Sequence, residues 1–387
     1  RSSIPCYEGL TLHLFPRYKT VMGRSSTTFS GKWHSGKTTV VRVPQILANR
    51  VIQYARELDT QANVARDPEA IYRTAAHVEL NQPINVAAVP HRSPFRYPGG
   101  KTWLVPYVRS WLSSLRPRPQ LLIEPFAGGG IVGLTAGIEL LADHVILVEK
   151  DADVAAVWKV ILSGQAEWLA QRIEEFSLTK ANVLTVLRKA PRNPRERAFA
   201  TIIRNRVQRG GIMAAGAGLV KNGENGRGLS SRWYPQTLAE RIRTIAEMRE
   251  RFSFVEGDGM EVIQSYAREK NAAFFVDPPY TVAARRLYSH WQVDQRTLFN
   301  LLRRVEGSVL LTYDSTVEIS DLAVEFGFET QAVAMKNTHH ARMTELLVGK
   351  DLTWLRLAQA SSVSRARTAQ VTLAFPQCAL RPRVPKW

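Results

Sequence analysis

The sequence has little cysteine, no long apolar run and a shortage of acidic residues relative to basic ones. The two cysteines, Cys6 and Cys378, lie near opposite ends of the 387 residues, so neither a disulfide framework nor a zinc site is supported. No apolar run is long enough to cross a membrane, and no signal peptide is recognisable. We therefore expect a cytoplasmic protein without a membrane partner.

The excess of basic residues is the strongest compositional signal. Lys and Arg number 52 against 34 Asp and Glu, which gives a formal net charge of +18. Such a balance favours a polyanionic partner, most often nucleic acid, although a solvated basic surface without function is the alternative. Apolar residues make up 45% of the chain, which is ample for a core.

The two ends of the chain differ in composition from the rest. Residues 1–21 have no clear periodicity and precede Met22, so we expect a translated leader with Met22 as the true start. Residues 353–387 form a basic tail, which has no acidic residue from Arg356 onward. We expect both ends to be poorly ordered.

Residues 22–81 predict a small accessory domain. A β-like stretch precedes helical patterns over 45–58 and 68–79. This order resembles a ribbon-helix-helix unit, which dimerises and can place its strands in a DNA groove, although an accessory domain of unknown purpose is equally open. Residues 31–38 match the P-loop pattern but lack the required strand before and helix after, so nucleotide binding is not predicted. Residues 82–94 are expected to be a linker.

A short apolar run over 272–276 ends abruptly at Asp277-Pro278-Pro279-Tyr280. The run predicts a buried central strand of a parallel sheet. The two prolines have no N–H, so they end the hydrogen-bond ladder and stiffen the turn. Ligands bind at the carboxyl ends of strands in open α/β sheets. The corner therefore offers a carboxylate, carbonyls and an aromatic face, with a capped strand exit as the alternative.

A strand, a glycine turn and a helix are predicted in succession over residues 121–141. Glu124 stands at the end of the strand, and the turn is Phe126-Ala127-Gly128-Gly129-Gly130. The next strand ends in Glu149, and an acid about twenty residues past such a turn can hold a ribose diol. Glu124 would suit a cationic amino group rather than a phosphate. A ligand with a ribose, an ammonium and no phosphate is S-adenosylmethionine.

With these motifs, residues 95–350 resemble the Dam-type N(6)-adenine DNA methyltransferases. Residues 124–130 look like the cofactor motif of that family, and 277–280 matches its catalytic motif. Residues 95–101 look like its N-terminal cofactor motif, although Tyr97-Pro98 stands where Trp-Ala is more usual. The glycine motif precedes the catalytic motif with a long insertion between them, as in that group.

The resemblance implies an α/β, Rossmann-like methyltransferase sheet with an inserted helical DNA-recognition lobe. The catalytic domain would comprise 95–154 and 252–352, and the target-recognition domain 155–251. From Arg188 to Arg251 there are fifteen Lys or Arg against five Asp or Glu. We therefore expect this lobe to bind duplex DNA.

The resemblance also implies roles for individual residues. Asp258, in Gly257-Asp258-Gly259, would hydrogen-bond the adenine of the cofactor, or else be an ordinary turn residue. The expected cofactor-binding residues are Tyr97, Gly99, Lys101, Glu124, Phe126, Gly128, Gly130, Glu149, Asp258 and Asp277. The expected catalytic residues are Asp277, Pro278, Pro279 and Tyr280. The expected DNA-binding residues are Arg204, Asn205, Arg206, Arg209, Lys221 and Arg227.

The catalytic corner suits methylation of an adenine amino group. The lone pair of that nitrogen is delocalised into the ring, and two acceptors, the Asp277 carboxylate and the Pro278 carbonyl, would favour its pyramidalisation. Asp277 would also stabilise the positive charge that develops on the nitrogen. The target base must leave the stack, and Tyr280 would give it a new face. No metal is required, and His290 is not needed as a base.

Three hypotheses remain at this point. The leading one is a site-specific DNA adenine methyltransferase, associated with the nucleoid. The others are an adenine methyltransferase acting on structured RNA and a non-catalytic DNA-binding regulator on the same fold. The leading hypothesis leaves room for a restriction endonuclease partner in the host, and we expect a monomer or weak dimer.

Overall fold

The computed structural model describes residues 89–96, 100–213, 217–223, 226–279, 293–336 and 342–359. The predicted leader and the predicted accessory domain lie outside the described residues, as does most of the predicted tail. Tyr97, Gly99, Tyr280 and His290 lie outside them as well.

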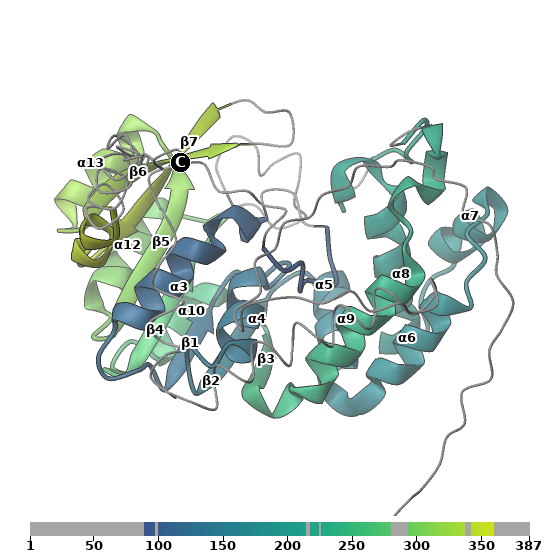
Figure 1. The fold of residues 1–387 in the computed structure, drawn as a ribbon, viewed down its shortest axis with the longest axis horizontal. Coiled ribbons are helices and arrows are strands. Elements are labelled where there is room, and N and C mark those ends of the chain that lie inside the picture. Colours follow the sequence, from purple (N-terminus) through teal and green to yellow (C-terminus); the bar gives the residue numbers. More distant parts are fainter. Residues whose placement is uncertain are drawn as a thin grey trace, which may run out of the picture. The chain divides into compact units, whose positions relative to one another are not determined.

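A seven-stranded sheet forms the centre of the fold, with the order β3-β2-β1-β4-β5-β7-β6 (Figure 1). Strand β7 pairs antiparallel with β5 and β6, and the pairings from β3 to β5 are parallel. The strands are β1 Leu121–Glu124, β2 His144–Glu149, β3 Phe252–Glu256, β4 Ala272–Val276, β5 Ser308–Asp314, β6 Glu329–Lys336 and β7 Arg342–Gly349. The strands predicted at the start of 121–141, before Glu149 and over 272–276 are confirmed as β1, β2 and β4, together with the predicted Rossmann-like α/β class.

The apolar strands are buried on both faces, and alternate residues enter two separate cores. In β4, Phe275 belongs to one core and Phe274 to the other, because successive side chains point to opposite faces. The first core takes Tyr107, Leu134 and Trp158 from α3 Val105–Ser114, α4 Ile131–Ile138 and α5 Ala152–Val160. The second takes Ile263, Leu298 and Ile319 from α10 Gly259–Ser265, α12 Gln295–Arg304 and α13 Val317–Glu325. Helices therefore cover both faces of the sheet.

The helix predicted after the turn of residues 126–130 is confirmed as α4, but its predicted end was wrong. The 3-10 turn η2 Lys101–Leu104 runs into α3, and Asp294 caps α12 by accepting from Thr297 N at 2.6 Å. The helix predicted over 131–141 ends at Ile138. Leu140 then adopts φ 58°, a left-handed conformation that cannot continue an α-helix.

A helical insertion occupies the chain between β2 and β3. Helix α5 packs against α8, and α6 packs against α9. Figure 1 shows these helices beyond the β3 edge of the sheet. The insertion after α5 consists of η3 Ile161–Gln165, α6 Ala166–Glu174, α7 Lys180–Arg188, α8 Pro194–Val207, η4 Arg209–Gly211, η6 Gly228–Arg232, α9 Pro235–Glu247 and η7 Arg249–Arg251. We call this insertion the lobe.

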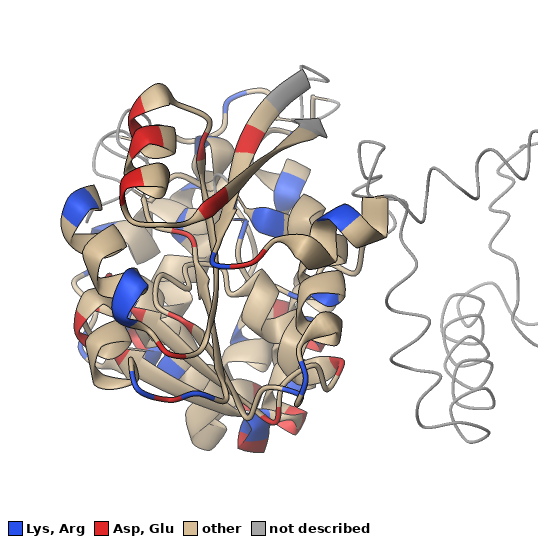
Figure 2. Cartoon of the chain, turned by 90° about the vertical axis from the view of Figure 1, so that its left-hand side faces the viewer, with Lys and Arg blue, Asp and Glu red and all other residues tan. Residues whose placement is uncertain are grey.

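Two neighbouring helices differ in charge: α12 carries Arg296, Arg303 and Arg304 and no acidic residue, whereas α13 is acidic. Helix α13 carries Glu318, Asp321 and Glu325 and no basic residue. Figure 2 views the molecule from the side on which α12 and α13 lie, and acidic bands are prominent there. The basic surplus over 188–251 belongs to the lobe. Among the residues that the structure describes, no helix is long and apolar enough to cross a membrane.

Candidate active site

Strands β1 and β4 are neighbours near the centre of the sheet. The chain continues from β1 through β2 and β3 toward one edge, and from β4 through β5 toward the other, so the strand order reverses between them. Strand β1 pairs with β2 on one side and with β4 on the other. The crevice at such a switch point, outside the carboxyl ends of the strands, is where open α/β sheets bind ligands. Glu124 ends β1 and Asp277 follows β4 directly, so both predicted acids lie at this crevice.

Asp277 is held by donors from two other elements. Its Oδ1 atom accepts a hydrogen bond from Thr312 Oγ1 of β5 at 2.9 Å, and Lys101 Nζ lies 2.9 Å from the same oxygen. The Asp277 side chain is 22% exposed, whereas Thr312 is fully buried. Two donors on one oxygen fix the plane of the carboxylate, and its partial exposure leaves it accessible to a ligand.

Lys101 was predicted to bind the cofactor, and the structure places its ammonium on the carboxylate of Asp277, a predicted catalytic residue. Its Nζ also lies 3.0 Å from Glu345 Oε1 of β7. Burial by itself would lower the pKa of Lys101, but Asp277 and Glu345 raise it above its ordinary value, so Lys101 stays charged. Glu345 is 3% exposed. Sequence reasoning assigned no role to Thr312 or Glu345, although a carboxylate in an apolar strand is a signal, because buried carboxylates need a partner.

Glu124 is a buried acid that accepts a hydrogen bond from the backbone. Its Oε2 accepts from Gly133 N in the first turn of α4 at 2.7 Å. Burial raises the pKa of Glu124 to about 8; the Gly133 N–H opposes this shift and the nearby Asp277 adds to it. The carboxyl group is therefore mainly protonated at neutral pH, and a cation placed beside it would favour the ionised form.

Glu149 ties the end of β2 to the glycine turn. Its Oε1 accepts from Lys150 N and Asp151 N at 2.8 Å each, and its Oε2 accepts from Gly128 N at 3.0 Å. Burial raises the pKa of Glu149 to about 7 against the effect of these backbone donors. The predicted ribose acid and the predicted cofactor turn are thus in direct contact.

The turn itself needs glycine at two positions. Gly128 and Gly130 have φ angles of 47° and 60°, which favour glycine. A Cβ on Gly130 would lie 2.9 Å from the ring of Trp158, whose Nε1 donates to Gly128 O at 3.0 Å. Phe126, the first residue of this turn, is partly exposed.

Asp258 stands at the N-terminus of α10, beside the end of β1. It caps the helix by accepting a hydrogen bond from Met260 N at 2.9 Å. Its Oδ2 accepts a second hydrogen bond from Lys150 Nζ at 2.7 Å. Lys150 and the Met260 N–H hold the pKa of Asp258 below its ordinary value although partial burial opposes them. A Cβ on Gly259 would lie 2.2 Å from Pro125 O. The turn role is therefore present, and Asp258 lies at the same edge as Glu124 and Glu149.

The six residues predicted to bind DNA fall into two groups. Arg209, Lys221 and Arg227 are exposed. Arg204 forms an ion pair with Asp153, and Asn205 and Arg206 are buried, at 0% and 7% exposure. Their side chains bond the backbone of residues 94–96 and Gly211. This location does not fit the predicted contact of Asn205 and Arg206 with DNA, because neither side chain reaches the surface.

An aromatic residue in the lobe was missed from the sequence. The Arg227 guanidinium lies over the ring of Tyr234, 5.6 Å from its centroid, and Tyr234 is 51% exposed. A stacked and exposed pair of this kind can lie against nucleic-acid bases or phosphates.

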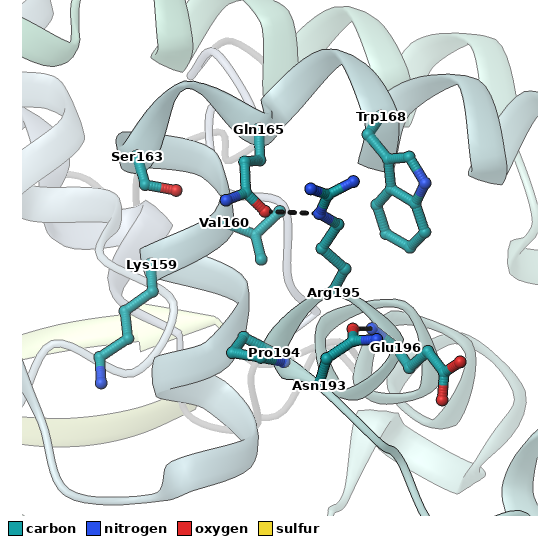
Figure 3. A pocket seen from close by; sticks show the side chains of 9 residues that line it. All are labelled: Lys159, Val160, Ser163, Gln165, Trp168, Asn193, Pro194, Arg195 and Glu196. Carbon is teal, nitrogen blue, oxygen red and sulfur yellow. Dashed lines mark hydrogen bonds between the residues drawn. The ribbon is translucent and has the colours of Figure 1, made fainter.

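A surface cavity of about 590 Å³ lies elsewhere, where α5, η3, α6 and α8 meet (Figure 3). Arg195 Nε donates to Gln165 Oε1 across it at 2.8 Å. Its lining residues are Lys159, Val160, Ser163, Gln165, Trp168, Asn193, Pro194, Arg195 and Glu196. None of them belongs to the predicted site at the strand ends.

The chain was compared with protein families, curated proteins and solved structures. The model of the D12 class N6 adenine-specific DNA methyltransferase family matches residues 97–337. No curated protein matches the chain significantly. Among solved structures, the chain is similar to a "putative RNA methyltransferase PH1948" from Pyrococcus horikoshii, at 12% identity and a TM-score of 0.31. The match covers 73% of this chain and 96% of that one.

Proposed function

The chain belongs to the D12 class N6 adenine-specific DNA methyltransferase family, and we propose that it methylates the exocyclic amino group of an adenine flipped out of duplex DNA, with S-adenosylmethionine as methyl donor. The observation that carries this proposal is the Asp277 carboxylate, fixed by Lys101 and Thr312 at the switch point of the sheet. Beside it lie a glycine turn and two acids that suit the donor.

The residues at the strand ends fit S-adenosylmethionine by their chemistry. Glu124 is a buried carboxyl group that becomes favourable as an anion only when a cation such as an ammonium is near. Glu149 presents a carboxylate next to the turn, where a ribose diol can donate to it. The glycine turn brings its backbone to this edge of the sheet through left-handed angles at Gly128 and Gly130, which favour glycine.

The donor supplies a methyl group on a sulfonium, and the protein provides the setting for its transfer. The Asp277 carboxylate and the Pro278 carbonyl accept the two hydrogens of the adenine amino group, which frees its lone pair. A bond forms between that nitrogen and the methyl carbon, the carbon–sulfur bond breaks, and the sulfur leaves as a thioether. Asp277 stabilises the positive charge that develops on the nitrogen, and that nitrogen then gives one proton to water.

Lys101 and Thr312 keep the Asp277 carboxylate in one orientation. Lys101 is itself held by Glu345, so its charge is largely balanced and does not cancel that of Asp277. Preorganised charge of this kind accelerates reactions because no group must move as the transition state forms. The exposed Arg209, Lys221 and Arg227 lie in the lobe, where they would contact the DNA backbone.

The proposal is tested by labelled methyl transfer. Purified protein is incubated with S-adenosylmethionine carrying a labelled methyl group and with either duplex DNA or ribosomal RNA. We expect label on adenine in DNA and none in the Asp277→Ala variant. Asp321→Asn, on exposed α13, is the matched control and should retain activity. Label in RNA alone, or full activity of Asp277→Ala, would contradict the proposal.

A further inference from the structure

Residues 93–96, which we call the strap, join the glycine turn to the lobe. At the turn, Ser93 Oγ donates to Gly129 O at 2.5 Å, and the same hydroxyl accepts from Phe95 N at 3.1 Å. The buried Phe95 ring packs on Trp158, with 6.0 Å between the ring centroids, and Trp158 Nε1 donates to Gly128 O. The first part of the strap therefore contacts two consecutive carbonyls of the turn, one directly and one through Trp158.

The second part of the strap is held by the C-terminal end of α8. Asn205 Oδ1 accepts from Arg96 N at 2.9 Å, and Asn205 Nδ2 donates to Arg96 O at 2.9 Å. One side-chain amide thus satisfies both backbone polar groups of Arg96, as a neighbouring strand would. Arg206 Nη2 donates to Pro94 O at 2.6 Å.

The contact between the strap and the lobe is specific in shape and in hydrogen bonding. Asn205 Nδ2 also donates to Gly211 O at 3.2 Å, so the amide spans the strap and the segment after α8. Gly211 has φ 76°, and a Cβ there would lie 2.2 Å from Arg96 O. Asn205 is fully buried. An aspartate could not replace it, because a carboxylate would face two carbonyl oxygens without a proton to donate.

The residues next to these contacts in the chain include one expected to bind DNA and one expected to bind the cofactor. Gly211 ends η4, which begins at the exposed Arg209, one of the expected DNA contacts. On the other side, the strap precedes Lys101, whose ammonium lies on Asp277. The strap thus connects the lobe segment that begins at Arg209 with the segment that leads to Lys101 at the expected cofactor site.

We propose that Asn205 is a positioning residue for the cofactor site, and that the strap couples the lobe to the glycine turn so that DNA and cofactor increase each other's affinity. The inference rests on the proposed function, because it requires the turn to hold S-adenosylmethionine. Coupling between two sites is reciprocal and is commonly worth about 5-fold to 150-fold in affinity. We assign a positive sign because the hydrogen bonds of Ser93 and Asn205 hold one strap conformation, and each ligand would favour the conformation that the other binds.

The test measures the affinity of S-adenosylhomocysteine by calorimetry, with and without linear plasmid DNA. For Asn205→Ala we expect binding about tenfold weaker, since two hydrogen bonds to the strap are lost. DNA affinity without cofactor should change less than about twofold. The increase in cofactor affinity caused by DNA should be lost. Asn205→Asp should be weaker still, and Asn222→Ala, an exposed asparagine of the same lobe, should bind S-adenosylhomocysteine as the unmodified protein does.

Ser93→Ala removes the hydrogen bond between the strap and the glycine turn and changes no residue of the lobe. It should reproduce the loss of coupling, and the double variant with Asn205→Ala should be less than additive, because both changes remove the same connection. Thermal melting identifies any variant that fails to fold. Unchanged cofactor affinity in Asn205→Ala together with weaker DNA binding would overturn the inference and make Asn205 a DNA contact. Failure of the unmodified protein to bind S-adenosylhomocysteine would instead overturn the proposed function.

Discussion

Lys101 Nζ lies 2.9 Å from Asp277 Oδ1, so the N-terminal glycine motif and the catalytic motif meet at one carboxylate. Glu345 is the second partner of the ammonium, at 3.0 Å. A buried cation between two carboxylates is a rigid arrangement, because moving any member would leave an unpaired charge. The sheet thus orients Asp277 before any ligand binds.

Glu345→Gln should lower kcat more than it raises KM. The amide keeps the shape of the side chain but removes a charge, so Lys101 would pair with Asp277 alone and compete with the adenine amino group. We expect a loss of about 100-fold in kcat for Lys101→Met, at the lower end of the range for removal of one preorganised group, and a smaller loss of about tenfold for Glu345→Gln, because Glu345 acts through Lys101. Steady-state kinetics with varied S-adenosylmethionine measures both constants. Lys180→Met, an exposed lysine of α7, serves as control, and an unchanged kcat in Glu345→Gln would exclude its positioning role.

Cofactor binding should release protons near neutral pH. The pKa of Glu124 is about 8 and that of Glu149 about 7, both raised chiefly by burial. Ionisation of both acids on binding an ammonium and a diol would release about 1.5 protons at pH 7, and Glu124→Gln should reduce this to about half a proton. Calorimetry with S-adenosylhomocysteine in buffers of different ionisation enthalpy gives the number. Equal release by the unmodified protein and by Glu124→Gln would refute a role for Glu124 in charge recognition.

The free energy of unfolding of the protein without ligand should fall as pH rises from about 5 to 8. The ordinary pKa of Glu124 is 4.5 and its pKa in the folded protein is about 8. Between these values the folded state binds more protons than the unfolded state. The contribution of Glu124 to the free energy of unfolding is therefore complete below pH 4.5 and is lost as the pH rises through 8. Urea unfolding at pH 5.5 and pH 8.5 should show this decrease, and Glu124→Gln should show a smaller one. A decrease of the same size in both proteins would assign it to other groups.

The exposed basic residues of the lobe should determine the salt dependence of DNA binding. Removal of one phosphate contact lowers the slope of log K against log salt by about 0.9. We therefore expect a shallower slope for Lys221→Ala. Arg204→Ala should leave the slope unchanged, since Arg204 pairs with Asp153. Fluorescence anisotropy with a labelled duplex over a range of salt measures the slopes, and the reverse result would place Arg204 at the DNA.

The sequence predicts this fold well where local chemistry decides it. The apolar run 272–276 and its two prolines predict both the β4 strand and its end. The glycines at 128 and 130 predict a turn, and both adopt positive φ angles. The approach of Lys101 to Glu345 could not be predicted, because it depends on the antiparallel placement of β7 beside β5. The orientation of Asn205 and Arg206 was also missed, since basic composition does not reveal which side chains of a helix face inward.

The central claim is that Asp277 directs methylation to the amino group of adenine in DNA. Mass spectrometry of nucleosides from the DNA of a host that expresses the protein tests it most directly. The account predicts N6-methyldeoxyadenosine with the unmodified protein and its absence with Asp277→Ala, in a host that lacks this modification otherwise. Methylated cytosine in place of methylated adenine, or methylated adenine that persists in Asp277→Ala, would contradict it.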